Sequence, residues 1–85
     1  MSNPKKPNPI DVHVGKRLRE AREKRDLTQK ELAKKLGITH QQVQKYESGA
    51  NRIRASKLFE ISKALNVSVI WFFEGVPGNG SDQQQ

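Results

Sequence analysis

Two short segments, each opened by a threonine and joined by only Gly37 and Ile38, constrain the fold of this chain more than any other feature. In the stretch TQKELAKKLGITHQQVQKYESG, Thr28 and Glu31 have the spacing of a capping box, in which each side chain bonds the other residue's amide. Gly37 can adopt the positive φ that ends a helix, and Thr39 opens a second helix, with Gln42 in the reciprocal capping position, that ends at Gly49. So short a link predicts two helices that cross steeply, because a long antiparallel hairpin would need a longer turn.

Apolar residues with helical spacing predict three further helices around this pair. The first runs from about Asp11 to Arg25, and the fourth begins at Ser56 or its neighbour and ends at Asn66. The fifth is the short run VIWFFE, residues 69–74, capped by Ser68 and closed by Gly75. Because no segment shows the sustained alternation of a half-buried strand, we expect an all-α, compact five-helix domain. The residues expected inside are Val14, Leu18, Ala21, Leu32, Ala33, Leu36, Val43, Tyr46, Leu58, Ile61, Leu65, Val69 and Phe72.

The two ends of the chain have a different composition from its centre. Residues 1–9 hold prolines and lysines, and residues 77–85 are equally poor in large apolar side chains. We therefore expect a flexible basic arm (1–9), one domain (10–76) and a disordered tail (77–85). No apolar run approaches the roughly 18 residues of a membrane-spanning helix. With no cysteine and no signal sequence before the domain, we expect a soluble cytoplasmic protein without membrane contact.

The charge balance points to an anionic partner. Sixteen Lys and Arg against nine Asp and Glu give a formal net charge of +7 over 85 residues. In so short a chain this favours nucleic acid ahead of a membrane surface, the alternative being charge that serves only solubility. His13 and His40 stand apart from any acid or cysteine cluster, and no phosphate-binding glycine loop or nucleophile elbow occurs. We predict no enzyme, no metal, no cofactor and no small-molecule ligand.

The segment between Thr39 and Gly49 carries hydrogen-bonding side chains on one face. Its apolar Val43 and Tyr46 belong to the core side, and the positions left outward are i, i+1, i+4 and i+5 of a helix. Glutamine can bind adenine through two hydrogen bonds in the major groove, and lysine can donate to guanine acceptors. The candidates for reading bases are therefore His40, Gln41, Gln44 and Lys45. A merely solvated face is the alternative, but caps, turn and spacing together favour DNA.

Residues 14–75 resemble the lambda-repressor-like helix-turn-helix domain of the Xre/Cro group of bacterial and phage regulators, most clearly from Leu27 to Gly49. The resemblance implies binding to a double-stranded DNA operator and transcriptional regulation, with repression expected. It also implies an ion pair between Arg22 and Glu47. After Gly49 relatives often have proline, whereas this chain reads ANRIRAS. The residues expected to hold DNA phosphates are Gln29, Thr39, Asn51 and Arg52.

The resemblance further implies a homodimer on a two-fold operator, because relatives pair at the end of the last helix. Relatives often place polar residues where this chain has Ile70 and Trp71. Left in water beside Phe73, these two residues would form an exposed apolar patch, which is typical of a binding surface. We expect an interface centred on Trp71, with Ile70 and Phe73 around it. The alternative is that Trp71 folds back on the first or fourth helix of its own subunit.

A different class of function would use the same fold for protein interaction, as an antitoxin or a restriction-modification controller protein. An antitoxin usually needs an extra segment that covers its toxin, and only residues 1–9 and 77–85 are spare here. This favours a DNA-binding regulator. The operator sequence, the sign of regulation and the regulated genes remain open at this point.

Overall fold

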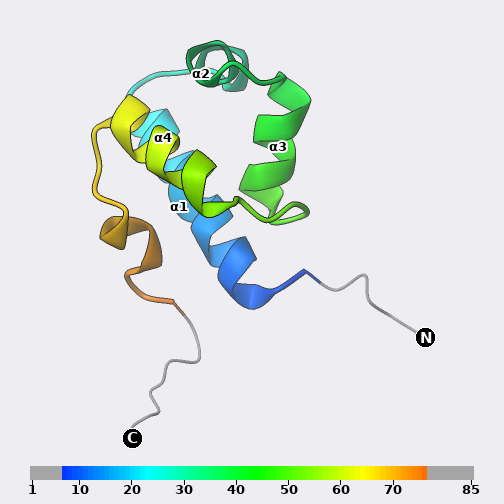
Figure 1. Cartoon of the computed structure of the whole chain (residues 1–85), viewed down its shortest axis with the longest axis vertical. Helices are drawn as coiled ribbons and strands as arrows, with labels where there is room; N and C mark the ends of the chain where they lie inside the picture. The colour runs from blue at the N-terminus through cyan, green and yellow to red at the C-terminus, as the bar shows by residue number, and fades with distance from the viewer. Residues whose placement is uncertain (1–6, 77–85) are drawn as a thin grey trace, which may run out of the picture.

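The structure is a computed structural model that describes residues 7–76 (Figure 1). The predicted tail and most of the predicted arm, residues 77–85 and 1–6, lie outside the described residues. The described part contains four α-helices and one 3₁₀ turn, and no strand. The elements are α1 (Pro9–Lys24), α2 (Gln29–Leu36), α3 (His40–Ser48), α4 (Ala55–Leu65) and η1 (Ile70–Phe73).

The all-α fold is confirmed, but the prediction of a fifth helix is wrong. Residues Ile70–Phe73 form a single 3₁₀ turn. Its first backbone hydrogen bond runs from the amide of Trp71 to the carbonyl oxygen of Ser68. Two breaks leave no room for a longer helix: Asn66 ends α4 with a left-handed φ of 57°, and Glu74 is extended. Because β-branched and aromatic residues are poor helix formers, nothing local opposes these breaks.

The start of α1 lies two residues before the predicted Asp11, for a reason that is visible in the sequence. The Asn8 side chain accepts a hydrogen bond from the amide of Ile10 at 2.7 Å, as an N-cap does. Pro9 follows at the first helical position, where a residue without an amide hydrogen loses nothing. Residues 8 and 9 therefore belong structurally to α1.

The predicted boundaries of α2 and α3 are confirmed. The hydroxyl of Thr28 accepts from the Glu31 amide at 3.0 Å, and the Glu31 carboxylate accepts from the Thr28 amide at 2.8 Å. Gly37 takes φ 70°, and the Thr39 hydroxyl accepts from the amide of Gln42 at 3.1 Å. In Figure 1 α2 is seen nearly end-on above α3, which runs lengthwise, so the two helices cross steeply.

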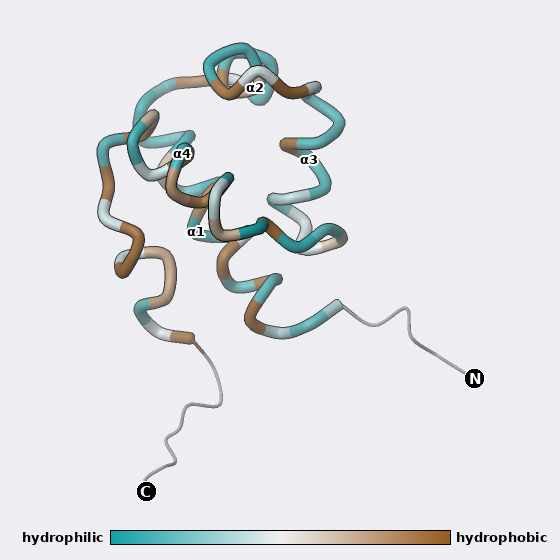
Figure 2. Tube along the Cα trace, in the orientation of Figure 1, coloured by the Kyte–Doolittle hydropathy of each residue, from teal (hydrophilic) through white to brown (hydrophobic). Residues whose placement is uncertain are grey.

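The core lies between α1, α2, α3, α4 and η1. Each helix in Figure 2 carries both polar and apolar positions, as expected for helices with one buried face. The largest fully buried side chains come from all five elements. They are Leu18, Leu32, Val43, Ile61, Leu65 and Phe72.

Gly15 on α1 is where α3 approaches most closely. A Cβ atom at this position would lie 2.7 Å from the carbonyl oxygen of Glu47 and still closer to that of Tyr46. Only glycine lets the two backbones approach in this way. Gly15 therefore sets the distance of α3 from the rest of the domain, and the sequence analysis did not identify it.

Candidate nucleic-acid interface

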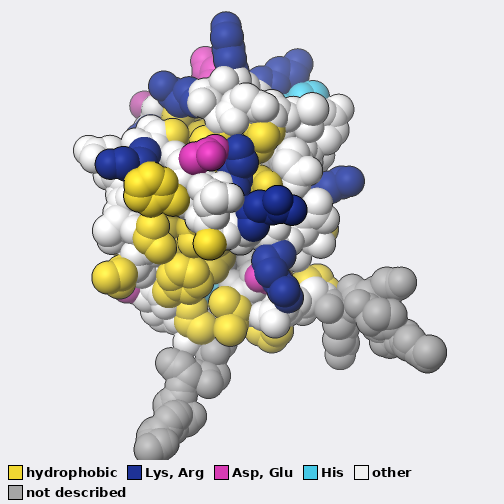
Figure 3. Space-filling view, viewed as in Figure 1, with side chains coloured by type: hydrophobic (Ala, Val, Ile, Leu, Met, Phe, Trp, Pro, Cys, Tyr) yellow, Lys and Arg dark blue, Asp and Glu magenta, His cyan; other side chains and the backbone are white. Residues whose placement is uncertain are grey.

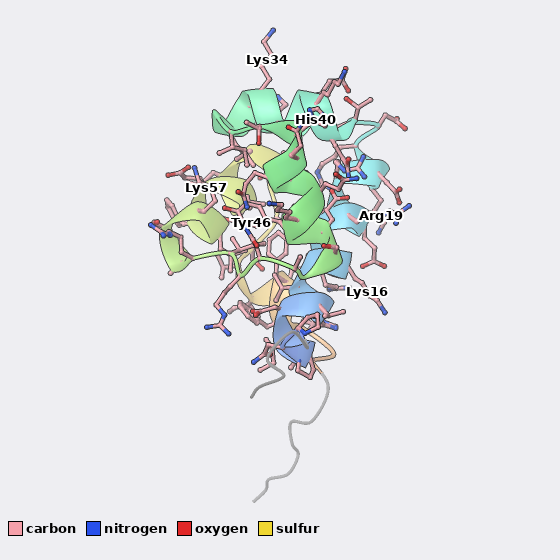
Figure 4. All side chains as sticks on the ribbon, turned by 90° about the vertical axis from the view of Figure 1, so that its right-hand side faces the viewer. Lys16, Arg19, Lys34, His40, Tyr46 and Lys57 are labelled. Atoms are coloured by element: carbon pink, nitrogen blue, oxygen red, sulfur yellow. The ribbon has the colours of Figure 1, made fainter. Side chains whose placement is uncertain are left out.

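The outer face of α3 presents hydrogen-bonding side chains without an exposed acid. Its inner face buries Val43 fully and Tyr46 to 8% exposure. Gln41, Gln44 and Lys45 are exposed and His40 is half-buried at the first turn, so the four predicted base-reading residues share one surface. Figure 4 shows this helix facing the viewer, with His40 at its upper end.

The one acid on α3 is removed from this surface by an ion pair with α1. Glu47 accepts hydrogen bonds from Arg22 Nε at 2.6 Å and from Arg22 Nη2 at 3.0 Å. The two side chains are only 5% and 10% exposed. A third donor of Arg22, Nη1, bonds the carbonyl oxygen of Leu27 at 2.7 Å. The pair therefore ties the end of α3 to α1 and to the loop before α2.

Gln29 extends this network to α2. Its Nε2 donates to Glu47 Oε1 at 3.0 Å, so the carboxylate holds two helices besides its own. The pKa of Arg22 is raised above its ordinary value, chiefly by its hydrogen bond to Glu47. Burial lowers that pKa, and the charges of Glu47 and Glu23 raise it further. Arg22 therefore stays charged, and its guanidinium balances the charge of the only carboxylate on α3.

The residues predicted to hold phosphates lie at both ends of α3. Gln29 begins α2, and its side-chain amide donates to Glu47. Thr39 is the N-cap of α3, and its hydroxyl accepts from the amide of Gln42. Asn51 and Arg52 are exposed in the loop that follows, where the Asn51 amide donates to the carbonyl oxygen of Lys45 at 3.2 Å. Arg52 Nε donates to the carboxylate of Asp11 on α1 at 3.1 Å. Neither this contact nor the Gln29–Glu47 bond has a signal in the sequence.

Basic side chains flank α3 on both sides. In Figure 4 Lys16 and Arg19 of α1 lie on the right of the helix and Lys57 of α4 lies on the left. Arg19 pairs with Glu23, and Lys57 with Glu60, in contacts whose acids are about half exposed to solvent. Such exposed pairs exchange readily for other partners, because solvent screens them. The face around α3 is thus able to accept an anionic polymer.

The end of the described chain exposes apolar side chains next to α1. Ile70 is 73% exposed and Phe73 is 41% exposed. Trp71, expected in solvent, is instead half-buried against the core. Arg17 lies over its ring at 3.7 Å and donates to its carbonyl oxygen from Nε at 3.0 Å and from Nη2 at 2.7 Å.

An apolar surface runs over α4 and η1. In Figure 3, which has the orientation of Figure 1, hydrophobic side chains gather at the lower left of the molecule. A shallow hollow of about 200 Å³ opens beside Phe73. The residues that line it are Ile10, Asp11, Val14, Arg52, Ile53, Leu58 and Phe73.

Residues 7–76 contain neither a cluster of potential metal ligands nor a membrane-spanning helix. None of the described acids and histidines form a group of three or more that could hold a metal ion. Nor does any helix in this range combine the length and apolar character needed to cross a membrane.

Comparison with known proteins assigns the chain to a family. The family model described as "Helix-turn-helix" matches residues 18–72, and the chain belongs to this family. The Xre/Cro-type assignment made from Leu27–Gly49 is thereby confirmed. A protein of Sinorhizobium medicae, described as an uncharacterized HTH-type transcriptional regulator, is 55% identical over 80 residues. That match covers 94% of this chain but only 58% of the relative, so the chain spans little more than half the relative's length.

Solved structures of similar fold include two phage or bacterial regulators. The restriction-modification controller protein C.AhdI from Aeromonas hydrophila is 29% identical, with a TM-score of 0.69 over 73% of this chain and 94% of that one. The P22 c2 repressor, solved in complex with a synthetic operator, is 27% identical, with a TM-score of 0.68 over the same two shares.

Proposed function

We propose that this chain binds double-stranded DNA with sequence specificity and regulates transcription, with α3 as the helix that enters the major groove. One observation carries the proposal. The only acid of α3 is buried against Arg22, while amide and basic side chains of the same helix face solvent. The outward surface of α3 therefore carries no negative charge, which favours contact with a polyanion. The similarity to a repressor solved with its operator supports the same reading.

Four side chains of α3 are the proposed base readers. Gln41 and Gln44 can each bind an adenine edge through two hydrogen bonds, and Lys45 can donate to guanine. His40 stands at the first turn, the part of a recognition helix that enters the groove. The close packing of α3 against Gly15 and the Arg22–Glu47 pair hold this helix in place. This matters because base discrimination depends on fixed donor positions.

Phosphates on either side of the groove are proposed to bind Gln29, Thr39, Asn51 and Arg52. Such contacts fix the register of the protein on the duplex without reading sequence. Gln29 keeps one amide hydrogen for this purpose, since one bond to Glu47 uses only the other. The phosphate and base contacts together define the function as sequence-specific.

The test is to measure the affinity of variants for a duplex selected by the wild-type protein. Gln41→Ala should cost roughly 1–3 kcal/mol and relax preference at one base pair. Arg52→Ala should weaken all sequences alike and reduce the slope of log K against log salt by about 1. Lys34→Ala, which removes an exposed charge on α2, is the control for charge loss alone. If Gln41→Ala kept the wild-type sequence preference, α3 would not be the reader.

We further propose a homodimer that pairs through η1. The interface is formed by Ile70, Trp71 and Phe73, but its centre shifts from Trp71 to Ile70 and Phe73, the more exposed pair. Trp71 then packs beneath Ile70 and Phe73 on the core side of the interface, with Arg17 stacked on its ring. The hollow beside Phe73 offers space for an apolar side chain of the second copy. Such a dimer would set two α3 helices about one DNA turn apart, as a two-fold operator requires.

Ile70→Glu tests the dimer by sedimentation in the absence of DNA. A folded monomer with weakened operator binding is expected, since one charge on each copy would face the other. Gln41→Glu is the matched control for the oligomeric state alone, because it introduces the same side chain on an exposed position of α3 that is a proposed base reader and lies outside η1. A dimer retained by Ile70→Glu would contradict an interface at η1.

Repression is the proposed direction of regulation, by occlusion of a promoter. The alternative is a restriction-modification controller or an antitoxin with the same fold, and the similarity to C.AhdI favours the controller of these two. An adjacent restriction-modification or toxin gene would support the alternative. Reporter transcription in the presence of the chain separates repression from activation.

A further inference from the structure

We propose that Asp11 is a positioning residue for DNA binding, which holds the guanidinium of Arg52 by Nε and leaves both terminal amino groups for one phosphate. The inference rests on the proposed phosphate contact of Arg52. It adds a residue of α1, outside the helix-turn-helix segment, to the DNA-binding apparatus.

The contact joins a carboxylate on a helix to a guanidinium on a loop. Asp11 lies in the first turn of α1, which is anchored by the Asn8 cap, and its side chain is 18% exposed. Arg52 belongs to the irregular segment between α3 and α4, and its side chain is 71% exposed. An exposed arginine on a loop would normally sample many rotamers. The single bond from Nε to Asp11 restricts that freedom before DNA arrives.

The geometry leaves the useful donors of Arg52 available. Within residues 7–76, Nε is the only donor of this guanidinium that makes a hydrogen bond. The four hydrogens on the two terminal amino groups remain, and two of them can form a fork on a phosphate. Arg22 and Arg17 differ in this respect, because each spends two or more nitrogens on partners inside the domain.

The backbone around Arg52 is also held in place. The amide of Asn51 bonds the carbonyl oxygen of Lys45, and Ile53 packs against the core. The loop follows directly from α3 and crosses the same face of the domain in Figure 4. Asp11 thus fixes the side chain of a residue whose backbone already lies beside the reading helix.

The sign of the Asp11→Asn effect distinguishes positioning from simple charge. DNA repels a carboxylate, so removing one near the interface should by itself tighten binding slightly. Positioning predicts the opposite: affinity should fall by about 2- to 10-fold, the cost of ordering one arginine side chain on binding. Because Arg52 would still reach its phosphate, the salt slope should not change, whereas Arg52→Ala should reduce it by about 1.

The experiment measures binding of wild type, Asp11→Asn, Arg52→Ala and the double variant at several salt concentrations. The probes are a duplex with the selected site and a duplex of scrambled sequence. Glu20→Gln is the matched control, because its partner Arg17 is held by the Trp71 carbonyl oxygen and is not among the proposed DNA contacts. Circular dichroism verifies that each variant is folded, and Asp11→Glu should recover part of the affinity.

Asp11→Asn is expected to weaken binding of both duplexes alike. In the Arg52→Ala background it should leave the affinity unchanged or tighten it slightly, because only the loss of a carboxylate then remains. The proposal is overturned if Asp11→Asn alone tightens binding or leaves it unchanged, as Glu20→Gln should. It is also overturned if Asp11→Asn weakens the Arg52→Ala variant equally, because the effect would then come from the start of α1. Failure of the wild type to prefer the selected duplex would instead reject the proposed function itself.

Discussion

Replacement of Glu47 by alanine should be among the most destabilising single changes in this domain. It removes the acceptor of three hydrogen bonds, two from Arg22 and one from Gln29, and leaves a guanidinium that is 10% exposed without its partner. Breaking a buried pair in this way costs about 3–5 kcal/mol. A chain of 85 residues has a total stability of roughly 4–13 kcal/mol, so much of that stability should be lost.

Urea unfolding at 25 °C, followed by circular dichroism and by the fluorescence of Trp71, measures the change in the free energy of unfolding. In a thermal scan the same loss corresponds to a decrease of roughly 12–40 °C in Tm, at about 4–8 °C per kcal/mol for a domain of this size. Glu23→Ala is the matched control. It pairs with Arg19 at 3.0 Å and lies 4.0 Å from Arg22, but its own side chain is 54% exposed, so its removal leaves no buried charge without its main partner. We expect it to cost less than about 1 kcal/mol.

The result that would refute this reasoning is a Glu47→Ala variant as stable as Glu23→Ala. The double variant Arg22→Met with Glu47→Leu provides a second check. Because a packed apolar pair often replaces a buried ion pair without loss, it should be more stable than Glu47→Ala alone. If the double variant were the less stable of the two, desolvation of Arg22 would not be the cause of the loss.

Three further changes test contacts that hold α3, α2 and Trp71 in place. Gly15→Ala should displace α3 and cost about 1–3 kcal/mol by overpacking, as measured by urea unfolding, whereas Lys16→Ala beside it should be nearly neutral. Thr28→Ala should cost about 1 kcal/mol, because the Glu31 amide loses its cap; Thr28→Ser should retain most of it, and equal losses would contradict the capping box. Arg17→Ala should expose the Trp71 ring and shift its emission to longer wavelength, and an unchanged spectrum would argue against the stacked arrangement.

The parts of the fold that were predicted correctly are those with a local signal. The Thr28–Glu31 box, the left-handed Gly37 and the Thr39 cap depend on residues within one turn, so the sequence was sufficient for α2 and α3. The start of α1 was placed two residues late because the Asn8 cap was overlooked. The prediction of a fifth helix was wrong for another reason. The apolar pattern of residues 69–74 does not show that the backbone is already extended at Glu74, so that only one 3₁₀ turn forms.

The arrangement of the candidate site was predictable only in part. The outward positions of α3 follow from its helical period, whereas Gly15, the Gln29–Glu47 bond and the Asp11–Arg52 pair join residues far apart in the chain. No periodicity indicates such pairs before the helices are packed. Trp71 illustrates the same limit, since the Arg17 guanidinium that covers its ring comes from α1, far away in the sequence.

Selection of bound duplexes from a random pool tests the central claim most directly, namely that α3 of this chain reads a DNA sequence. We expect the wild-type protein to enrich a two-fold symmetric motif with half-sites about one helical turn apart. Gln41→Ala should enrich a motif with relaxed preference at one base pair in each half-site. Failure of the wild type to enrich any motif over the starting pool, or recovery of an identical motif with Gln41→Ala, would contradict the claim.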